Sequence, residues 1–208
     1  MDPTEKYFQR LYPNHSSYSR LFFRHGEQAR REAVHQWLGT TEGIDILDAG
    51  CGDGRFLRSV LAGTPNKVQL EDLVTGNVTL ACAHLQGFAT EVKGITRNAI
   101  GALEERHDLV LAVGILDYQP KWKEALATLI LRTRGILIAN LPRATHPRNL
   151  ARYSWLRMNG LHLNLIRHAP LKATLRTIGL PFDLRATSLE WFIKIDCQGE
   201  SQHAHHLG

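Results

Sequence analysis

The stretch ILDAGCGDGRF, residues 46–56, decides the fold. Apolar residues lead into Gly50, Gly52 and Gly54, which are spaced two apart. A turn from a strand into a helix needs backbone torsions that glycine adopts at little cost, and the missing side chains let a ligand approach the main chain. A tight turn without a ligand would need fewer glycines, so the stretch predicts a ligand-binding loop between a buried strand and a helix.

Hydrophobic periodicity predicts that strands alternate with helices along the rest of the chain. The expected strands cover residues 44–49, 67–70, 88–92, 108–113, 135–140, 184–188 and 191–196. The expected helices cover residues 16–38, 56–61, 77–85 and 122–133, and a zone of loops and helices covers 142–179. This alternation is typical of an α/β protein with a doubly wound, mostly parallel sheet of seven strands.

The last two expected strands are separated only by the residues around Leu189-Glu190. Such a short connection favours a hairpin, so one terminal strand should be antiparallel to its neighbour. Nothing in the composition marks a linker, and we expect one domain over residues 1–208. Residues 1–38 would form a helical cap or lid, and residues 39–208 the core.

Composition limits the class of protein. The chain has 208 residues, of which 43% are hydrophobic and 22% charged, as in a globular domain. No apolar run approaches the ~18 residues of a membrane span, and the first residues lack a secretory pattern. Cys51, Cys82 and Cys197 are scattered and lack metal-ligand spacing, which predicts reduced thiols in a cytoplasmic protein without a metal site.

The charge balance is basic, with a formal net charge of +5. Such a balance is compatible with nucleic acid, an anionic surface or an acidic small substrate as partner. The basic residues are spread along the chain and form no nucleic-acid-binding tail. A solvated basic surface is therefore the favoured interpretation, and a nucleic-acid partner is not expected.

The spacing of the loop narrows the choice of ligand. A dinucleotide loop reads G-x-G-x-x-G, whereas Arg55 stands here where the third glycine would be. Asp48 and Asp53 flank the loop, and their charges would repel a pyrophosphate. They suit a ligand that carries positive charge and hydroxyl groups.

The loop resembles the first motif of the class I S-adenosylmethionine (SAM)-dependent methyltransferases, an acidic residue followed by G-x-G-x-G. The resemblance implies SAM as the cofactor and a Rossmann-like fold. It assigns cofactor contacts to the loop residues Asp48, Gly50, Cys51, Gly52 and Gly54. A shorter resemblance, in YFQRLYPNHSSYSR and LDYQP, is to small-molecule methyltransferases such as the magnesium-protoporphyrin O-methyltransferases.

The resemblance also assigns cofactor contacts beyond the loop. The family's acid at the end of the second strand binds both ribose hydroxyls, and Asp72 matches it, with Glu71 as second choice and Leu73 alongside. After the third strand the family often carries Gly-Asp, where this chain has Gly94-Ile95. Ile95 would then meet adenine through packing and its backbone, and Val113, with Gly114, would line the cofactor after the fourth strand.

Asp117 and Tyr118 follow the fourth strand, where the resemblance places the methyl-transfer zone, and they are the candidate catalytic residues. The zone 142–179 would help to form the acceptor pocket. Its histidines are weaker candidates for a general base, and its arginines could bind an anionic acceptor or form a solvated face. These residues are His146, His162, His168, Arg143, Arg148, Arg152, Arg157 and Arg167.

Aromatic residues near the N-terminus exceed the needs of one amphipathic helix, which predicts a lid over an apolar acceptor pocket. They are Tyr7, Phe8, Tyr12, Tyr18, Phe22 and Phe23. The expected function is methyl transfer from SAM to a small organic acceptor. Two alternatives stay open, a non-catalytic SAM-binding scaffold and a methyltransferase for RNA or protein.

Overall fold

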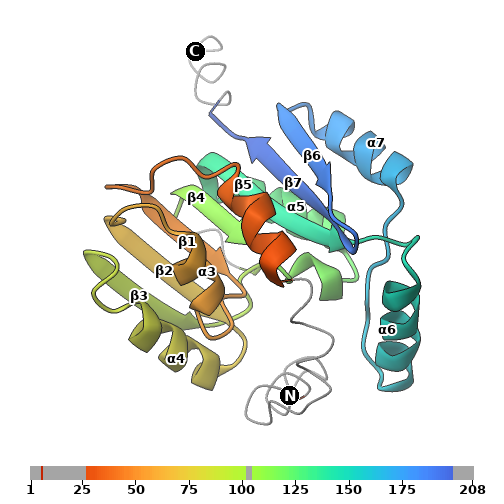
Figure 1. Ribbon diagram of the computed structural model, residues 1–208, viewed down its shortest axis with the longest axis horizontal. Coiled ribbons are helices and arrows are strands. Elements are labelled where there is room, and N and C mark those ends of the chain that lie inside the picture. Colours follow the sequence, from red (N-terminus) through yellow and green to blue (C-terminus); the bar gives the residue numbers. More distant parts are fainter. Residues whose placement is uncertain (1–5, 7–26, 102–104, 199–208) are drawn as a thin grey trace.

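The computed structural model describes residue 6, residues 27–101 and residues 105–198 of the chain. Its centre is a seven-stranded sheet with the order β3-β2-β1-β4-β5-β7-β6 (Figure 1). Strand β7 is antiparallel to β5 and β6, and the other pairs are parallel. The strands are β1 Asp45–Ala49, β2 Lys67–Asp72, β3 Glu91–Thr96, β4 His107–Ala112, β5 Thr133–Pro142, β6 Phe182–Ala186 and β7 Glu190–Asp196. The expected fold class and terminal hairpin are confirmed.

Helices cover both faces of the sheet, because successive strand side chains point to opposite sides. Ile46 of β1 packs with a helix at residues 27–35 and with helices α3 and α4, whereas Leu47 packs with α5 and α7. The labelled helices are α3 Arg55–Val60, α4 Thr75–Leu85, α5 Trp122–Leu131, α6 Pro147–Met158 and α7 His168–Ile178, with a 3₁₀ turn η1 at Leu116–Tyr118. Two apolar layers therefore fix the carboxyl ends of the central strands.

The prediction for the third strand was wrong by several residues. The strand begins at Glu91 and ends at Thr96, so Gly94 and Ile95 lie inside it. Phe88 is 39% exposed beneath the guanidinium of Arg58 and belongs to the turn after α4. β3 is an edge strand with mostly exposed side chains, so its sequence is polar and the apolar residues before it were mistaken for it.

Strand β6 also begins two residues earlier than predicted, at Phe182, and ends before Ser188. The predicted N-terminal helix lies partly outside the described residues, as do the aromatic residues assigned to a lid. Its described part buries Ala33, Val34 and Trp37 against the sheet. Among the described residues, none of the helices has the length and apolar character needed to cross a membrane.

Candidate active site

The glycine loop leaves β1 through three positive backbone torsions. Gly50, Gly52 and Gly54 have φ of 77°, 52° and 77°, in the region that favours glycine. A Cβ on Gly54 would lie 2.9 Å from Cα of Ala81 in α4, and one on Gly50 would lie 3.2 Å from Cβ of Ile115. The glycines therefore serve close packing of the loop against α4 and the β4 turn as well as the turn itself.

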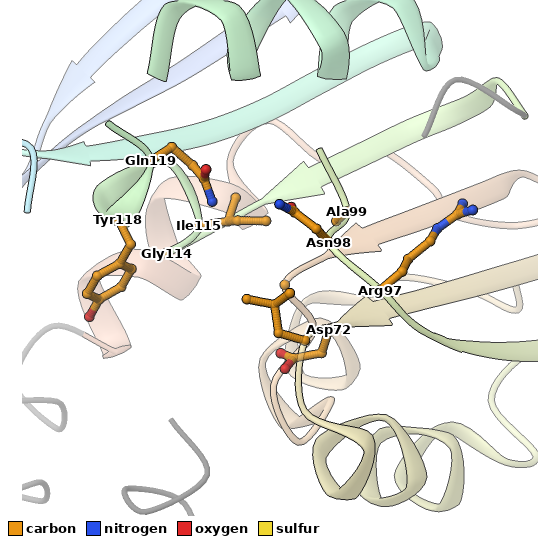
Figure 2. Close-up of a pocket in the computed structure, with 10 residues that line it drawn as sticks. Asp72, Arg97, Asn98, Ala99, Gly114, Ile115, Tyr118 and Gln119 are labelled. Carbon is orange, nitrogen blue, oxygen red and sulfur yellow. The ribbon is translucent and has the colours of Figure 1, made fainter. Parts of the chain in front are cut away.

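A pocket opens beside this loop at the carboxyl ends of the parallel strands (Figure 2). In a doubly wound sheet this is the edge where ligands bind. The turns after β1, β2, β3 and β4 all contribute to its wall. The lining residues are Gly50, Asp72, Leu73, Arg97, Asn98, Ala99, Gly114, Ile115, Tyr118 and Gln119.

Asp72 ends β2 and presents the acidic group of the pocket. Its Oδ2 accepts a hydrogen bond from the Gly52 N–H at 3.0 Å, and its Oδ1 accepts from the Val74 N–H at 2.9 Å and from Nδ2 of Asn77 at 3.1 Å. A carboxylate accepts about four hydrogen bonds. Three hydrogen bonds are already made here, so Oδ2 can accept about one more. The sequence analysis expected this carboxylate to bind both ribose hydroxyls. Burial raises the pKa of Asp72 above its ordinary value although these donors oppose the rise.

Glu71, the second choice for the ribose acid, is committed to a buried charge network. Its carboxylate is fully buried and binds Arg132 in a bidentate pair, with Oε2 at 2.8 Å and Oε1 at 2.6 Å. Arg97 donates to the same Oε1, and Arg132 also donates to the carbonyl of Ala99 at 2.6 Å. Burial alone would raise the pKa of Glu71, but donation from Arg132 and Arg97 lowers it below the ordinary value. The network holds the turn after β3, which forms one wall of the pocket.

Asp48 and Cys51 are buried and are not among the residues that line the pocket. Asp48 is 4% exposed, and no hydrogen bond from the described residues reaches its carboxylate. Burial, together with the charge of Asp72, raises the pKa of Asp48 to about 7. Burial also raises the pKa of the Cys51 thiol. The first acid of the motif is therefore buried and holds its proton more tightly than a free carboxyl group.

Asparagines hold the turn after β4. Oδ1 of Asn140 accepts the Gly114 N–H at 2.6 Å. Nδ2 of Asn164 donates to the carbonyls of Leu116 at 2.8 Å and Gln119 at 2.6 Å, and the Asn164 N–H donates to the carbonyl of Asp117 at 2.7 Å. Asn164 follows α6 and so ties the zone 142–179 to the pocket wall.

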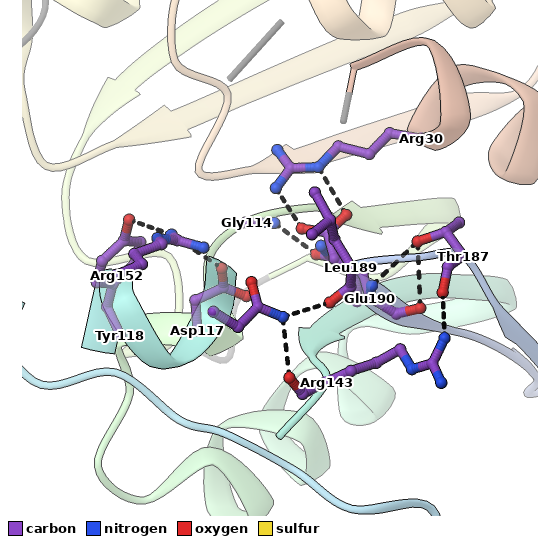
Figure 3. Close-up of polar contacts among 11 residues, drawn as sticks. Arg30, Gly114, Asp117, Tyr118, Arg143, Arg152, Thr187, Leu189 and Glu190 are labelled. Atoms are coloured by element: carbon purple, nitrogen blue, oxygen red, sulfur yellow. Dashed lines mark hydrogen bonds and ion pairs between the residues drawn. The ribbon is translucent and has the colours of Figure 1, made fainter. Parts of the chain in front are cut away.

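The two candidate catalytic residues lie differently in this turn. Tyr118 lines the pocket, and its hydroxyl oxygen accepts from Nη2 of Arg152 at 2.6 Å. Asp117 has no exposed surface and accepts from the same guanidinium at 3.3 Å (Figure 3). Burial raises the pKa of Asp117. Arg152 of α6 thus joins both residues, but only Tyr118 faces the pocket.

A second ion pair lies close to this group. Arg30, in the helix at residues 27–35, binds both carboxylate oxygens of Glu190 at the start of β7, with Nε at 2.8 Å from Oε2 (Figure 3). Glu190 is 3% exposed. The charge of Glu190 raises the pKa of Asp117 and that of Arg30 lowers it, although burial has the largest effect.

The structure brings several predicted cofactor residues to one pocket and leaves others elsewhere. Gly50, Asp72 and Leu73 line it. Ile95 lies within β3 opposite Glu71, and Val113 packs against the core while its neighbour Gly114 faces the pocket. The sequence analysis missed the wall formed by Arg97, Asn98 and Ala99, together with Ile115, Gln119 and the tether Asn164. A later boundary for β3 would have indicated that wall.

The histidines and arginines of the zone 142–179 do not belong to the lining of this pocket. His146 caps α6, His162 bonds Oδ1 of Asn164, and the His168 ring packs against Trp191; none of them lines the pocket. Arg143 donates to the carbonyl of Thr187 and lies over Trp191. None of the five arginines is among the residues that line the pocket, and Arg152 reaches its wall through the Tyr118 hydroxyl.

Comparisons with known proteins give structural matches only. No family model and no curated protein matches the sequence. The magnesium protoporphyrin IX methyltransferase of Synechocystis PCC 6803, solved with bound S-adenosylhomocysteine (SAH), is 17% identical with a TM-score of 0.67, over 87% of this chain and 88% of that chain. The 1,6-didemethyltoxoflavin-N1-methyltransferase of Burkholderia thailandensis is 16% identical with a TM-score of 0.67, over 93% and 87%.

The N-methyltransferase NodS of Bradyrhizobium japonicum WM9, solved with SAH, is 12% identical with a TM-score of 0.63, over 94% of this chain and 98% of that chain. These chains match almost the whole of this one. The protein therefore has the class I SAM-dependent methyltransferase fold.

Proposed function

We propose that the protein is a SAM-dependent methyltransferase that methylates a small organic acceptor. The observation that supports this most is the position of Asp72, whose remaining acceptor capacity faces a pocket closed on one side by Gly50. A carboxylate in this place suits a ribose hydroxyl, and the G-x-G-x-G spacing of the adjacent loop differs from that of a dinucleotide loop. The structural neighbours bound to SAH or SAM support the same cofactor.

The pocket offers groups that would suit the ribose and the adenine of the cofactor. Asp72 would accept a ribose hydroxyl, and Leu73 and Ile115 would pack against the adenine. Oδ1 of Asn98 accepts the Ile100 N–H at 3.1 Å, so its amide N–H groups can serve the base. The pocket wall carries Asn98, so an amide side chain supports adenine binding where the sequence analysis expected only packing and the backbone of Ile95.

Bound SAM supplies a methyl group on a sulfonium, ready for in-line displacement. The protein's contribution is then alignment of the acceptor and, for a phenol or alcohol, removal of a proton. Tyr118 would contact the acceptor because it lines the pocket. Asp117 is buried, so we propose that it acts as a positioning residue that holds Arg152 against the Tyr118 hydroxyl.

The test is transfer of a radiolabelled methyl group from SAM to a panel of small phenols, amines and carboxylic acids, with RNA and protein included as competing substrates. We expect SAM-dependent labelling of a small acceptor that is lost on heating the enzyme. Labelling of RNA or protein alone would contradict the proposed substrate class. Tight SAH binding without labelling of any substrate would favour the scaffold.

A further inference from the structure

One long segment of this chain contains basic residues but no acidic residue. Residues 125–182 contain nine Lys and Arg residues, three His and no Asp or Glu. All 20 acidic residues lie in the other 150 positions (208 − 58 = 150). The segment includes α6 and α7, which lie toward the same end of the molecule as β6 and β7 and away from β3 and α4 (Figure 1).

Several of these cations face outward without a carboxylate partner. Arg132, Arg143 and Arg152 are used inside the protein, as described above. Arg157, Arg167 and Arg176 are exposed, and no carboxylate of the described residues forms an ion pair with them. The segment therefore carries exposed positive charge that no carboxylate of the described residues neutralises.

Helix α6 combines this charge with exposed apolar side chains. Leu150 is 49% exposed and Met158 is 78% exposed. Residues seven and eight apart fall on one side of a helix, so Leu150, Arg157 and Met158 share the outer face of α6. On the inner face, Leu156 is buried and Arg152 reaches Tyr118 in the pocket wall. We call Leu150, Ser154, Arg157 and Met158 the outer face of α6.

We propose that the outer face of α6 docks on the surface of an anionic membrane. Lipid phosphates would attract the exposed arginines, and Leu150 and Met158 would enter the boundary between headgroups and acyl chains. Nucleic acid offers the same charge but no apolar phase, so it leaves the two exposed side chains unexplained. Docking would bring the pocket close to the lipid interface, because the inner face of the same helix contacts Tyr118.

The experiment is co-sedimentation of the full chain with vesicles of phosphatidylcholine alone and with vesicles that also contain phosphatidylglycerol. We expect binding to the second kind, weakened by added salt. Leu150→Ser with Met158→Ser should lower the partition coefficient about tenfold or more, since each buried CH₂ favours the membrane. Arg157→Gln should lower it about fivefold, the effect of removing one cation near an anionic surface.

Matched controls come from exposed residues elsewhere. Leu80→Ser with Leu131→Ser removes two leucines of similar exposure, 50% and 53%, from α4 and α5. Lys121→Gln with Lys123→Gln removes two exposed charges outside the segment. Both controls should bind vesicles like the parent, and every variant should retain SAH binding.

Three results would overturn the proposal. They are failure of the parent to sediment with anionic vesicles, equal losses in the controls and the α6 variants, and binding of an RNA oligonucleotide in place of vesicles. The SAH measurement separates this proposal from the proposed function. A variant that loses vesicle binding but still binds SAH affects docking alone and leaves the proposed function untouched.

Discussion

Adjacent carboxylates at the end of β2 should have separable roles, one in ligand binding and one in stability. Asp72→Asn keeps the shape of the side chain and removes its charge. The structure leaves Oδ2 capacity for one ribose hydroxyl, and a hydrogen bond to a charged group contributes about 1.5–3 kcal/mol. We therefore expect SAH affinity to fall about ten- to a hundredfold. The melting temperature should fall less than in a variant that breaks a buried ion pair, because an amide oxygen can still accept from Val74 and Asn77 and only the Gly52 N–H loses its acceptor.

Glu71→Gln should have the opposite profile. It leaves the guanidinium of Arg132, which is 1% exposed, without its charged partner. Breaking a buried pair in this way costs about 3–5 kcal/mol. For a domain of this size that corresponds to a fall of roughly 6–20 °C in melting temperature. Molecules that remain folded should bind SAH within about threefold of the parent, a difference of roughly 0.7 kcal/mol.

The assay is calorimetric titration with SAH beside a thermal melt for each variant. Asp53→Asn is the control, because Asp53 belongs to the same loop but pairs with Arg55 and does not line the pocket. It should shift affinity by no more than about 0.5 kcal/mol. Normal SAH binding by Asp72→Asn together with lost binding by folded Glu71→Gln would refute the assignment of the two carboxylates.

Other predictions concern the buried acid, the turn and its tether. Because burial raises the pKa of Asp48 to about 7, the folded protein holds this proton more tightly than the unfolded chain, and stability is lost as the pH rises from about 4 to 7. Asp48→Asn should therefore gain stability over the parent across that range in melts. Tyr118→Phe should lower kcat about a hundredfold and leave the Kd for SAH unchanged. Asn164→Ala should lower kcat about tenfold or more by loosening the turn, whereas Asn159→Ala, at an exposed helix end, should not.

Each of these has a contrary result. A stability difference for Asp48→Asn that does not vary with pH would contradict the buried neutral carboxyl. Full turnover by Tyr118→Phe would contradict the proposed contact between the Tyr118 hydroxyl and the acceptor. Equal losses of kcat in Asn164→Ala and Asn159→Ala would contradict a specific role for Asn164 in holding the turn.

The glycine loop could be predicted because its signal is local. The strand, the turn and the helix that need Gly50, Gly52 and Gly54 are contiguous in the sequence, and so is the spacing to Asp72. The choice between Asp72 and Glu71 was different. It depended on Arg132, which lies 61 residues away from Glu71 in the sequence. Arg132 forms a buried ion pair with Glu71, so that only Asp72 remains to line the pocket.

The other misses share this cause. The edge position of β3 is a property of the assembled sheet, so its polar sequence carried no strand signal and Asn98 was not placed in the pocket. Asn164 reaches Leu116 across 48 residues, and no local pattern marks such a contact. Similarly, only the packing of η1 shows that Asp117 is buried while Tyr118 lines the pocket.

The most direct test of the account is calorimetric titration of the purified chain with SAM, SAH and NAD in turn. The account predicts binding of SAM and SAH with Kd in the micromolar range, about −8 kcal/mol at 1 μM, and no heat with NAD. Binding of NAD without binding of SAM or SAH would contradict it.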